Sequence, residues 1–302
     1  MLVSGPISVI IPAYNSAATI GKAIESVLAQ TLQPVEVLVV DDGSLDCTAE
    51  VVSRFDTPVR LIRRENGGPG AARNSAARQA KGDWLALLDA DDTWLPNKLE
   101  RQADYTFQPE YDVILGLGHL SDAPQYPTFD DIWNRNTIAT STALIRRSRF
   151  EAVGGFDEDR RLIGVEDWNL WLRMAAAGAG FVVSPDRLHK YSPAEGNLSS
   201  QVERILEADL VNVDKIARLL GLSDRKVRIR TARFLEECGR DLLHARSMTA
   251  ARSYFLRSLR FNPSRACVAG FVASLMPVGL LQLRRRIVHD SSGAAGEMHR
   301  RI

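Results

Sequence analysis

Short apolar runs alternate with helical patterns along the first hundred residues, and this alternation restricts the possible folds more than any other feature of the sequence. Four runs resemble strands buried on both faces, at 7–11, 35–40, 59–62 and 84–88. Helical spacing runs from Ile20 to Leu28 and from Gly70 to Ala80, and Pro96 opens another helix. The repetition predicts an α/β fold with a mostly parallel sheet, whose ligands bind beyond the carboxyl ends of its strands.

The alternation loosens after residue 110. We expect, in order, a strand, a polar loop, an extended segment, a helix and two strands, near 113–117, 121–136, 138–145, 166–177, 180–184 and 187–191. From 200 to 262 there is hardly a β-branched run, and the pattern predicts three helices. We therefore predict a first domain over 1–200, a helical C-terminal appendix over 201–290 and a disordered tail over 291–302.

Charge is unevenly distributed along the chain. Residues 1–220 hold 22 basic and 31 acidic side chains, whereas residues 221–302 hold 16 basic and 6 acidic ones. The formal net charge of +1 is therefore the sum of an acidic body and a basic tail. Such a tail is typical of a segment that meets anionic phosphates in a membrane surface or a nucleic acid. A solvated helical face explains the same charge equally well.

The tail also contains an uncharged stretch, 266–283, which is followed at once by Arg284-Arg285-Arg286. Its length approaches that of a membrane span, but Pro277 would break a helix near the middle. We favour a helix lying in the membrane interface and anchored by the arginines. Docking on the rest of the protein is the second alternative, and a true span is the third.

The cysteines and the N-terminus indicate the compartment. Cys47, Cys238 and Cys267 are odd in number, widely spaced and outside any CxxC pattern, so neither a disulfide framework nor a structural zinc site is expected. Residues 1–6 lack the basic region of a signal peptide. We therefore expect a reducing, cytoplasmic setting.

Four carboxylate-bearing loops follow predicted strands or lie in the later half: 41–44, 65–68, 89–92 and 166–167. Each alone fits a turn or a helix cap, but together they are expected to converge on one edge of the sheet. Asp89 and Asp91 directly follow a buried strand, and two carboxylates there suit a hard divalent ion such as Mg²⁺ or Mn²⁺. No phosphate-binding P-loop or histidine cluster competes with them.

Five motifs in order carry a resemblance: ISVIIPAYN at 7–15, VDDGS at 40–44, NGGPGAARN at 66–74, DADD at 89–92 and GVEDW at 164–168. In sequence and spacing they resemble glycosyltransferase family 2, the inverting sugar transferases of GT-A fold. The resemblance covers about residues 5–200. It implies a nucleotide-sugar donor, a divalent metal and a single-displacement transfer.

The resemblance also implies which residues bind the donor. Pro12, Ala13 and Tyr14 would line the base pocket, where a tyrosine face can stack on the base. Asp42 would accept a hydrogen bond from a uracil-type edge, and Arg73 would face the donor.

The chemistry is implied for a second group of residues. Asp91, helped by Asp89, would hold the metal on the diphosphate, with Ala90 between them also at the donor. Asp167 would be the general base that takes the proton of the acceptor hydroxyl. Glu166 is the rival for that role and is given a supporting one, because an acid at a helix N-terminus also interacts with the helix dipole.

One departure from the family pattern lies in 191–199. Family members commonly carry a histidine shortly before a closing Asn/Ser-x-Ser stretch, and here Ala194 stands in that place, with His189 nearby but out of register. Either Asp91, phosphates and water hold the metal, or Glu195 substitutes.

The expected function is therefore transfer of a hexosyl group from a nucleotide-sugar, with UDP as the expected nucleotide, to a glycan or lipid-linked saccharide in cell-surface polysaccharide synthesis. We expect a peripheral position at the inner face of the cell membrane, on anionic lipid, and no nucleic-acid partner. Two alternatives stay open: a non-catalytic nucleotide-sugar-binding scaffold and a sugar-phosphate nucleotidyltransferase. The latter would need a Gly-rich loop with Arg and Lys after the first strand, where this chain has Pro12-Ala13-Tyr14-Asn15.

Overall fold

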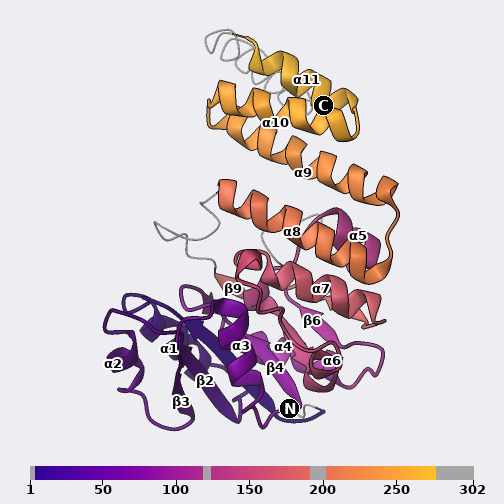
Figure 1. Ribbon diagram of the computed structural model, residues 1–302. Coiled ribbons are helices and arrows are strands. Elements are labelled where there is room, and N and C mark those ends of the chain that lie inside the picture. The colour runs from indigo at the N-terminus through magenta and orange to yellow at the C-terminus, as the bar shows by residue number, and fades with distance from the viewer. Residues whose placement is uncertain (1–3, 118–123, 191–201, 277–302) are drawn as a thin grey trace, which may run out of the picture. The chain divides into compact units, whose positions relative to one another are not determined.

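The computed structural model describes residues 4–117, 124–190 and 202–276 (Figure 1). The chain forms two compact units, divided between Leu220 and Gly221. The composition suggested a boundary at residue 200 instead. The difference is α8 (Val202–Leu220), which belongs to the first unit because it packs on α7 (Glu166–Ala176), where the Asn169 amide donates to Oδ1 of Asn212 at 2.9 Å.

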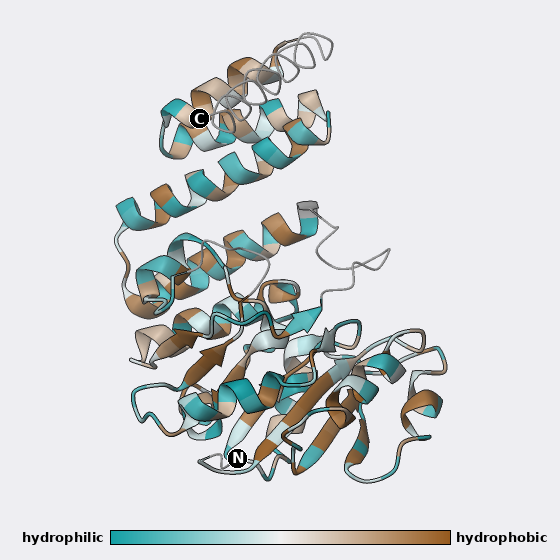
Figure 2. Ribbon diagram, turned by 180° about the vertical axis from the view of Figure 1, so that it is seen from behind, coloured by the Kyte–Doolittle hydropathy of each residue, from teal (hydrophilic) through white to brown (hydrophobic). Residues whose placement is uncertain are grey.

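Seven strands form the central sheet of the first unit: β1 (Ile7–Ala13), β2 (Glu36–Asp41), β3 (Val59–Arg63), β4 (Trp84–Leu87), β6 (Val113–Leu115), β7 (Leu144–Arg146) and β8 (Phe181–Val183). Their order is β3-β2-β1-β4-β7-β6-β8, and β7 alone among them runs antiparallel to its neighbours. The predicted mostly parallel sheet is therefore confirmed. The central strands β1, β2 and β4 are buried along their whole length and are mostly hydrophobic, as burial on both faces requires, whereas the edge strand β3 is only partly buried (Figure 2).

Helices flank this sheet: α1 (Ile20–Leu28), α2 (Thr48–Val52), α3 (Pro69–Ala77), α4 (Lys98–Thr106), α5 (Phe129–Asn134), α6 (Arg147–Ala152) and α7. The first unit also contains two short 3₁₀ helices, η1 (Thr140–Thr142) and η2 (Arg160–Leu162), and a two-stranded pair of β5 (Thr93–Trp94) with β9 (His189–Lys190). The main core lies where α1 buries Ile20, Ile24 and Val27 against β1, β2 and β4. Burial of this apolar stripe fixes the sheet that carries the candidate site.

The prediction of a polar loop over 121–136 is wrong in part, because helix α5 occupies the second half of that stretch. Thr128 caps this helix: its backbone N–H donates to Oδ2 of Asp131 at 2.9 Å, and its hydroxyl accepts from the Asp131 N–H at 3.3 Å. Ile132 and Trp133 are buried. A capping box and two buried side chains thus form a helix in a stretch whose composition is mostly polar. The extended segment expected over 138–145 is likewise interrupted by η1.

The second unit consists of α9 (Asp224–His244), α10 (Met248–Phe261) and α11 (Arg265–Ser274) within the described residues. Phe255, fully buried, lies at its centre. Gly239 and Gly270 let two helices approach this ring, since a Cβ built on them would lie 2.9 and 2.5 Å from its atoms. The three helices expected over 200–262 are present, although α8 packs in the first unit. Over the described ranges, no helix has both the length and the apolar character that a membrane span requires.

Candidate active site

The carboxyl ends of β2, β3 and β4 place three of the predicted loops at one edge of the sheet, next to the carboxyl end of β1. Ala13 pairs with Asp41, and Ile10 pairs with Leu87, so Asp89 leaves β4 two residues later. This edge is where open α/β sheets bind ligands.

The loops after β1 and β2 are bonded to each other. The Asn15 N–H donates to the Ser44 hydroxyl at 3.0 Å, and the Asn15 side-chain oxygen accepts from the Leu45 N–H at 2.8 Å. Asn15 has a φ of 49°, a left-handed conformation that asparagine tolerates better than most residues. Tyr14 is 49% exposed, so its ring can stack on a ligand. The other two residues predicted to line the base pocket, Pro12 and Ala13, are buried within β1.

The Asp42 carboxylate is largely engaged by the glycine loop before α3. It accepts from the Gly67 N–H at 3.0 Å and from the Gly68 N–H at 2.7 Å, and it pairs with Arg64 at 3.1 Å. Gly68 has a φ of 93°, and a Cβ there would lie 2.9 Å from the Ile163 side chain. Asp42 therefore fixes a turn that only glycine fits well, while contact with a base remains a prediction.

Arg73 joins two of the predicted carboxylate loops. Arg73 is 4% exposed, and its guanidinium donates to Oδ1 of Asp89 at 2.6 Å and to Oε1 of Glu166 at 2.8 Å. It also lies over the Phe156 ring, 5.2 Å from the ring centre. Burial by itself lowers the pKa of Arg73, but the charges of Asp89 and Glu166 outweigh it and raise that pKa above its ordinary value. The cation thus holds β4's loop against the start of α7.

The loop after β4 turns sharply, since the Asp92 N–H donates to the Asp89 carbonyl at 3.1 Å. The buried Asp92 carboxylate accepts from the Ser141 hydroxyl at 2.6 Å, whereas Asp89 and Asp91 are only half-buried. Within the part of the chain that the structure describes, no group of three or more metal-ligating side chains occurs. Two accessible carboxylates fit Mg²⁺ or Mn²⁺, which commonly bind few protein ligands and complete their shell with water and phosphate oxygens.

Asp167 lies at the start of α7 with both oxygens bonded. The Thr140 hydroxyl donates to Oδ2 at 2.7 Å and the Trp168 N–H donates to Oδ1 at 2.6 Å. Burial, followed by the charge of Glu166, raises the pKa of Asp167 to about 6. A carboxylate with such a pKa is ionised at neutral pH and is a stronger base than an exposed aspartate.

Neighbouring Glu166 is differently placed. It accepts from Arg73 and also from the Gly164 N–H, at 2.7 Å. With its oxygens engaged by a cation and the backbone, Glu166 suits the supporting role expected for it.

Two contributors to this site carried no signal in the sequence, namely Thr140 and Ser141. They lie in η1 just before β7, and because β7 runs antiparallel to β4, its amino end meets the carboxyl end of β4. The Thr-Ser-Thr tripeptide itself matches no motif. What places it at the site is the reversed direction of β7, which the sequence pattern does not show.

The segment with the departure, 191–199, lies outside the described residues, and so do Ala194 and Glu195. Just before it, His189 pairs with Trp94 and Lys190 pairs with Thr93, at the strand that follows Asp92. Lys190 therefore lies beside the residue that follows the Asp89–Asp92 turn.

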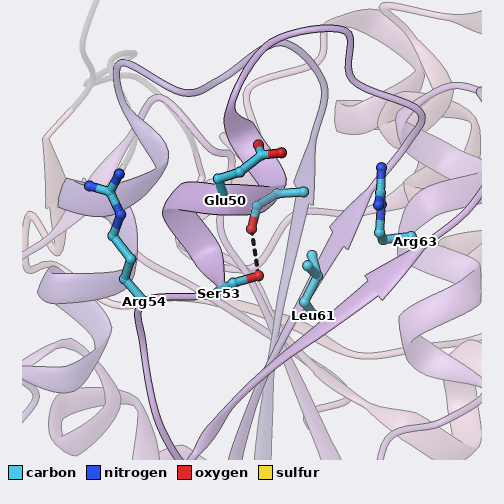
Figure 3. Close-up of a pocket in the computed structure, with 6 residues that line it drawn as sticks. Glu50, Ser53, Arg54, Leu61 and Arg63 are labelled. Atoms are coloured by element: carbon cyan, nitrogen blue, oxygen red, sulfur yellow. Dashed lines mark hydrogen bonds between the residues drawn. The ribbon is translucent and has the colours of Figure 1, made fainter.

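A separate pocket of 410 Å³ lies between α2 and β3 (Figure 3). Its lining consists of Ala49, Glu50, Ser53, Arg54, Leu61 and Arg63. None of the predicted site residues lines it, so it is distinct from the carboxylate cluster.

Comparison with known proteins identifies the family of this chain. Residues 8–160 match the family described as Glycosyl transferase family 2, and residues 128–237 match Glycosyltransferase like family 2. The UDP-Glc:alpha-D-GlcNAc-diphosphoundecaprenol beta-1,3-glucosyltransferase WfgD of Escherichia coli is 32% identical over 203 residues, 62% of this chain and 78% of that protein. An uncharacterized glycosyltransferase of Rickettsia prowazekii is 31% identical over 185 residues. This match covers 55% of the present chain and 58% of that protein's length.

Two solved structures show the fold. TarS of S. aureus, residues 1–349 in complex with UDP-GlcNAc, superposes with a TM-score of 0.61 at 20% identity, covering 89% of each chain. Mannosyltransferase PcManGT of Pyrobaculum calidifontis, in complex with GDP-Man and Mn²⁺, gives 0.61 at 20% identity, covering 90% of this chain and 87% of the other. The expected GT-A-type fold is confirmed.

Proposed function

This chain belongs to glycosyl transferase family 2, and we propose that it is an inverting glycosyltransferase that moves a sugar from a nucleotide-sugar to a glycan or lipid-linked saccharide. The observation that carries the proposal is the Arg73 bridge, which joins Asp89, a proposed metal ligand, to Glu166, the neighbour of the proposed base Asp167. The names of WfgD and of the succinoglycan biosynthesis protein ExoO of Rhizobium meliloti, 49% identical over 100 residues, support a place in polysaccharide synthesis.

The proposed reaction divides between the two sides of this bridge. On one side Asp167 accepts the proton of the acceptor hydroxyl, whose oxygen forms the new bond to the anomeric carbon. On the opposite face of the sugar the bond to the diphosphate breaks, and the nucleoside diphosphate leaves with that electron pair. Glu166 and Arg73 position Asp89 and α7 and take no proton.

Asp91 and Asp89 would hold a divalent cation beside the donor diphosphate. When bound, Mg²⁺ or Mn²⁺ would stabilise the negative charge that develops on the leaving diphosphate. Of Asp89, the Oδ1 atom is engaged by Arg73, so Asp91 is the main candidate ligand.

A donor screen tests the proposal. The full chain is incubated with UDP- and GDP-sugars, with and without Mn²⁺, and release of the nucleoside diphosphate is measured. Because the family resemblance implies a uracil-type base at Asp42, we expect release from a UDP-sugar that increases when a saccharide acceptor is added. A chain that binds a nucleotide-sugar with no turnover in any combination would instead be a binding scaffold.

We also propose that the enzyme works at the inner face of the cell membrane as a peripheral protein. Four apolar side chains in α11 and directly after it are 38–52% exposed: Val268 and Val272 in the helix, and Leu275 and Met276 beyond its end. The segment that follows, with Arg284-Arg285-Arg286, lies outside the described residues. Cys267 and Phe271 belong to the core of the second unit, so truncation before α11 would disturb that unit, and substitutions are the better test.

Binding of the full chain to vesicles should rise with the share of anionic lipid and weaken in high salt. Each arginine near an anionic surface contributes about 1 kcal/mol, which salt screens, whereas burial of apolar side chains is not screened. Replacing Arg284, Arg285 and Arg286 with glutamine should therefore reduce flotation with anionic vesicles.

The matched control removes three exposed arginines of the same unit, Arg225, Arg240 and Arg246. An equal loss in both triple variants would indicate diffuse charge attraction, and binding that ignores lipid charge would contradict the membrane proposal.

A further inference from the structure

Two adjacent hydroxyl residues of η1 reach the two acidic parts of the candidate site. The Thr140 hydroxyl donates to Asp167 at 2.7 Å. The Ser141 hydroxyl donates to Asp92 at 2.6 Å and accepts the Asp89 N–H at 3.1 Å. Thr140 is 7% exposed and Ser141 1%, and the Ser141–Asp92 bond is buried. One turn of 3₁₀ helix thus spans from the proposed base to the proposed diphosphate loop.

This turn is itself held by buried side chains behind it. The Trp94 indole N–H donates to the Ser141 carbonyl at 2.7 Å. The Gln102 amide donates to the carbonyls of Thr142 and Ile114, both at 2.9 Å. Both anchors have most of their surface buried, and a shift of η1 would leave their donors without acceptors, so the turn has a fixed position.

We propose that Thr140 and Ser141 are positioning residues of the transfer reaction, with Thr140 orienting Asp167 toward the acceptor hydroxyl and Ser141 fixing the Asp89–Asp92 turn for the donor diphosphate. The inference rests on the proposed function for the identity of the reaction. Neither hydroxyl touches the reacting atoms in this scheme. Each acts through the carboxylate or the backbone that it bonds.

The groups that face Asp167 give the proposal a measurable consequence. Burial and the charge of Glu166 raise the pKa of Asp167, whereas the Thr140 hydrogen bond, the Arg73 charge and the Trp168 N–H lower it. The base must be ionised, so transfer should fall as the pH falls through about 6. Removing the Thr140 hydroxyl takes away a donor to the charged form, and this acid limb should move upward.

The first arm of the test compares Thr140→Val with Thr140→Ser in the full chain. The carboxyl of Asp167 is titrated by ¹³C NMR without donor, and the pH profile of kcat/KM is measured with the donor found in the screen. The valine variant should shift both upward by about one pH unit, given the strength of a hydrogen bond to a charged group. The serine variant keeps the hydroxyl and should restore both. If Thr140→Val does not fold, Thr140→Ala serves in its place.

The second arm concerns Ser141→Ala. Binding of Mn²⁺, alone and with UDP, is followed by electron paramagnetic resonance, which needs no turnover. Loss of the Ser141 hydroxyl should weaken Mn²⁺ binding about tenfold, as the loss of groups that support metal ligands commonly does. The NMR titration of Asp167 should be unchanged in this variant.

Thr142→Val is the matched control, because the buried Thr142 hydroxyl belongs to the same turn and donates to the Ala139 carbonyl at 2.7 Å. It should move neither the Asp167 titration nor Mn²⁺ binding. The inference is overturned if Thr142→Val reproduces the other two variants, or if Thr140→Val and Ser141→Ala leave their measurements unchanged. A wild-type chain that turns over no donor refutes the proposed function separately, since the NMR and resonance measurements do not depend on it.

Discussion

Replacing Asp167 with asparagine should lower the rate of sugar transfer by about a hundred- to ten-thousandfold, the range that a general base commonly contributes. Asparagine has nearly the same shape, and its amide oxygen can still accept the Thr140 hydroxyl or the Trp168 N–H that Asp167 accepts at 2.7 and 2.6 Å. It cannot take a proton from the acceptor. The loss should appear in kcat, with the affinity for the donor preserved in calorimetry.

Glu166→Gln provides the comparison. It removes one of the two carboxylates that pair with Arg73 but leaves Asp167 in place, so its effect on transfer should be smaller. If Asp167→Asn abolished donor binding while Glu166→Gln reduced transfer more strongly, the roles of these two neighbours would have to be exchanged.

The central strands could be predicted from sequence because a strand that is buried on both faces needs a continuous run of apolar residues. Val37, Leu38, Val39 and Val40 are all fully buried, and nothing in their order depends on distant contacts. The same holds for the acidic loops, since carboxyl ends of parallel strands share one edge. The shared edge of the loops after β2 and β4 follows from this rule. Glu166 instead begins α7 and is joined to Asp89 through Arg73.

Contacts across the fold could not be predicted in the same way. Ser141 lies 49 residues from Asp92, and Thr140 lies 27 residues from Asp167. They meet because β7 reverses direction beside β4, and short apolar runs do not record the direction of a strand. The hydroxyls of such residues have no periodicity that a pattern can detect.

Arg73 shows the limit for a residue whose motif was recognised. The pattern places a cation on α3 near the donor edge, but its burial and its two carboxylate partners come from α7 and the loop after β4. A guanidinium that pairs with one carboxylate from each of two elements is suited to holding those elements together. Direct contact with the donor, which the family resemblance implies, remains a prediction.

Replacing Asp91 with asparagine should lower metal-dependent release of the nucleoside diphosphate by about a hundredfold or more, because stabilisation of a leaving diphosphate by a metal contributes several kcal/mol and each 1.36 kcal/mol is a factor of ten. Asp91 is half-buried in the turn after β4 and outside the core, so the fold should persist, which circular dichroism and thermal unfolding can check. Activity and Mn²⁺ binding should fall together.

Asp92→Asn is the sharpest control for this prediction, since it changes the adjacent residue by the same atoms. The buried Asp92 carboxylate accepts the Ser141 hydroxyl, and an asparagine oxygen can accept it too, so Mn²⁺ binding should fall much less than in Asp91→Asn. Full activity of the wild-type chain in excess chelator would contradict a metal at Asp91. Equal losses in both variants would show instead that Mn²⁺ binding depends on the whole Asp89–Asp92 turn and not on one carboxylate. The reason is that Ser141 holds this turn, so a change at any of its residues would shift the others with it.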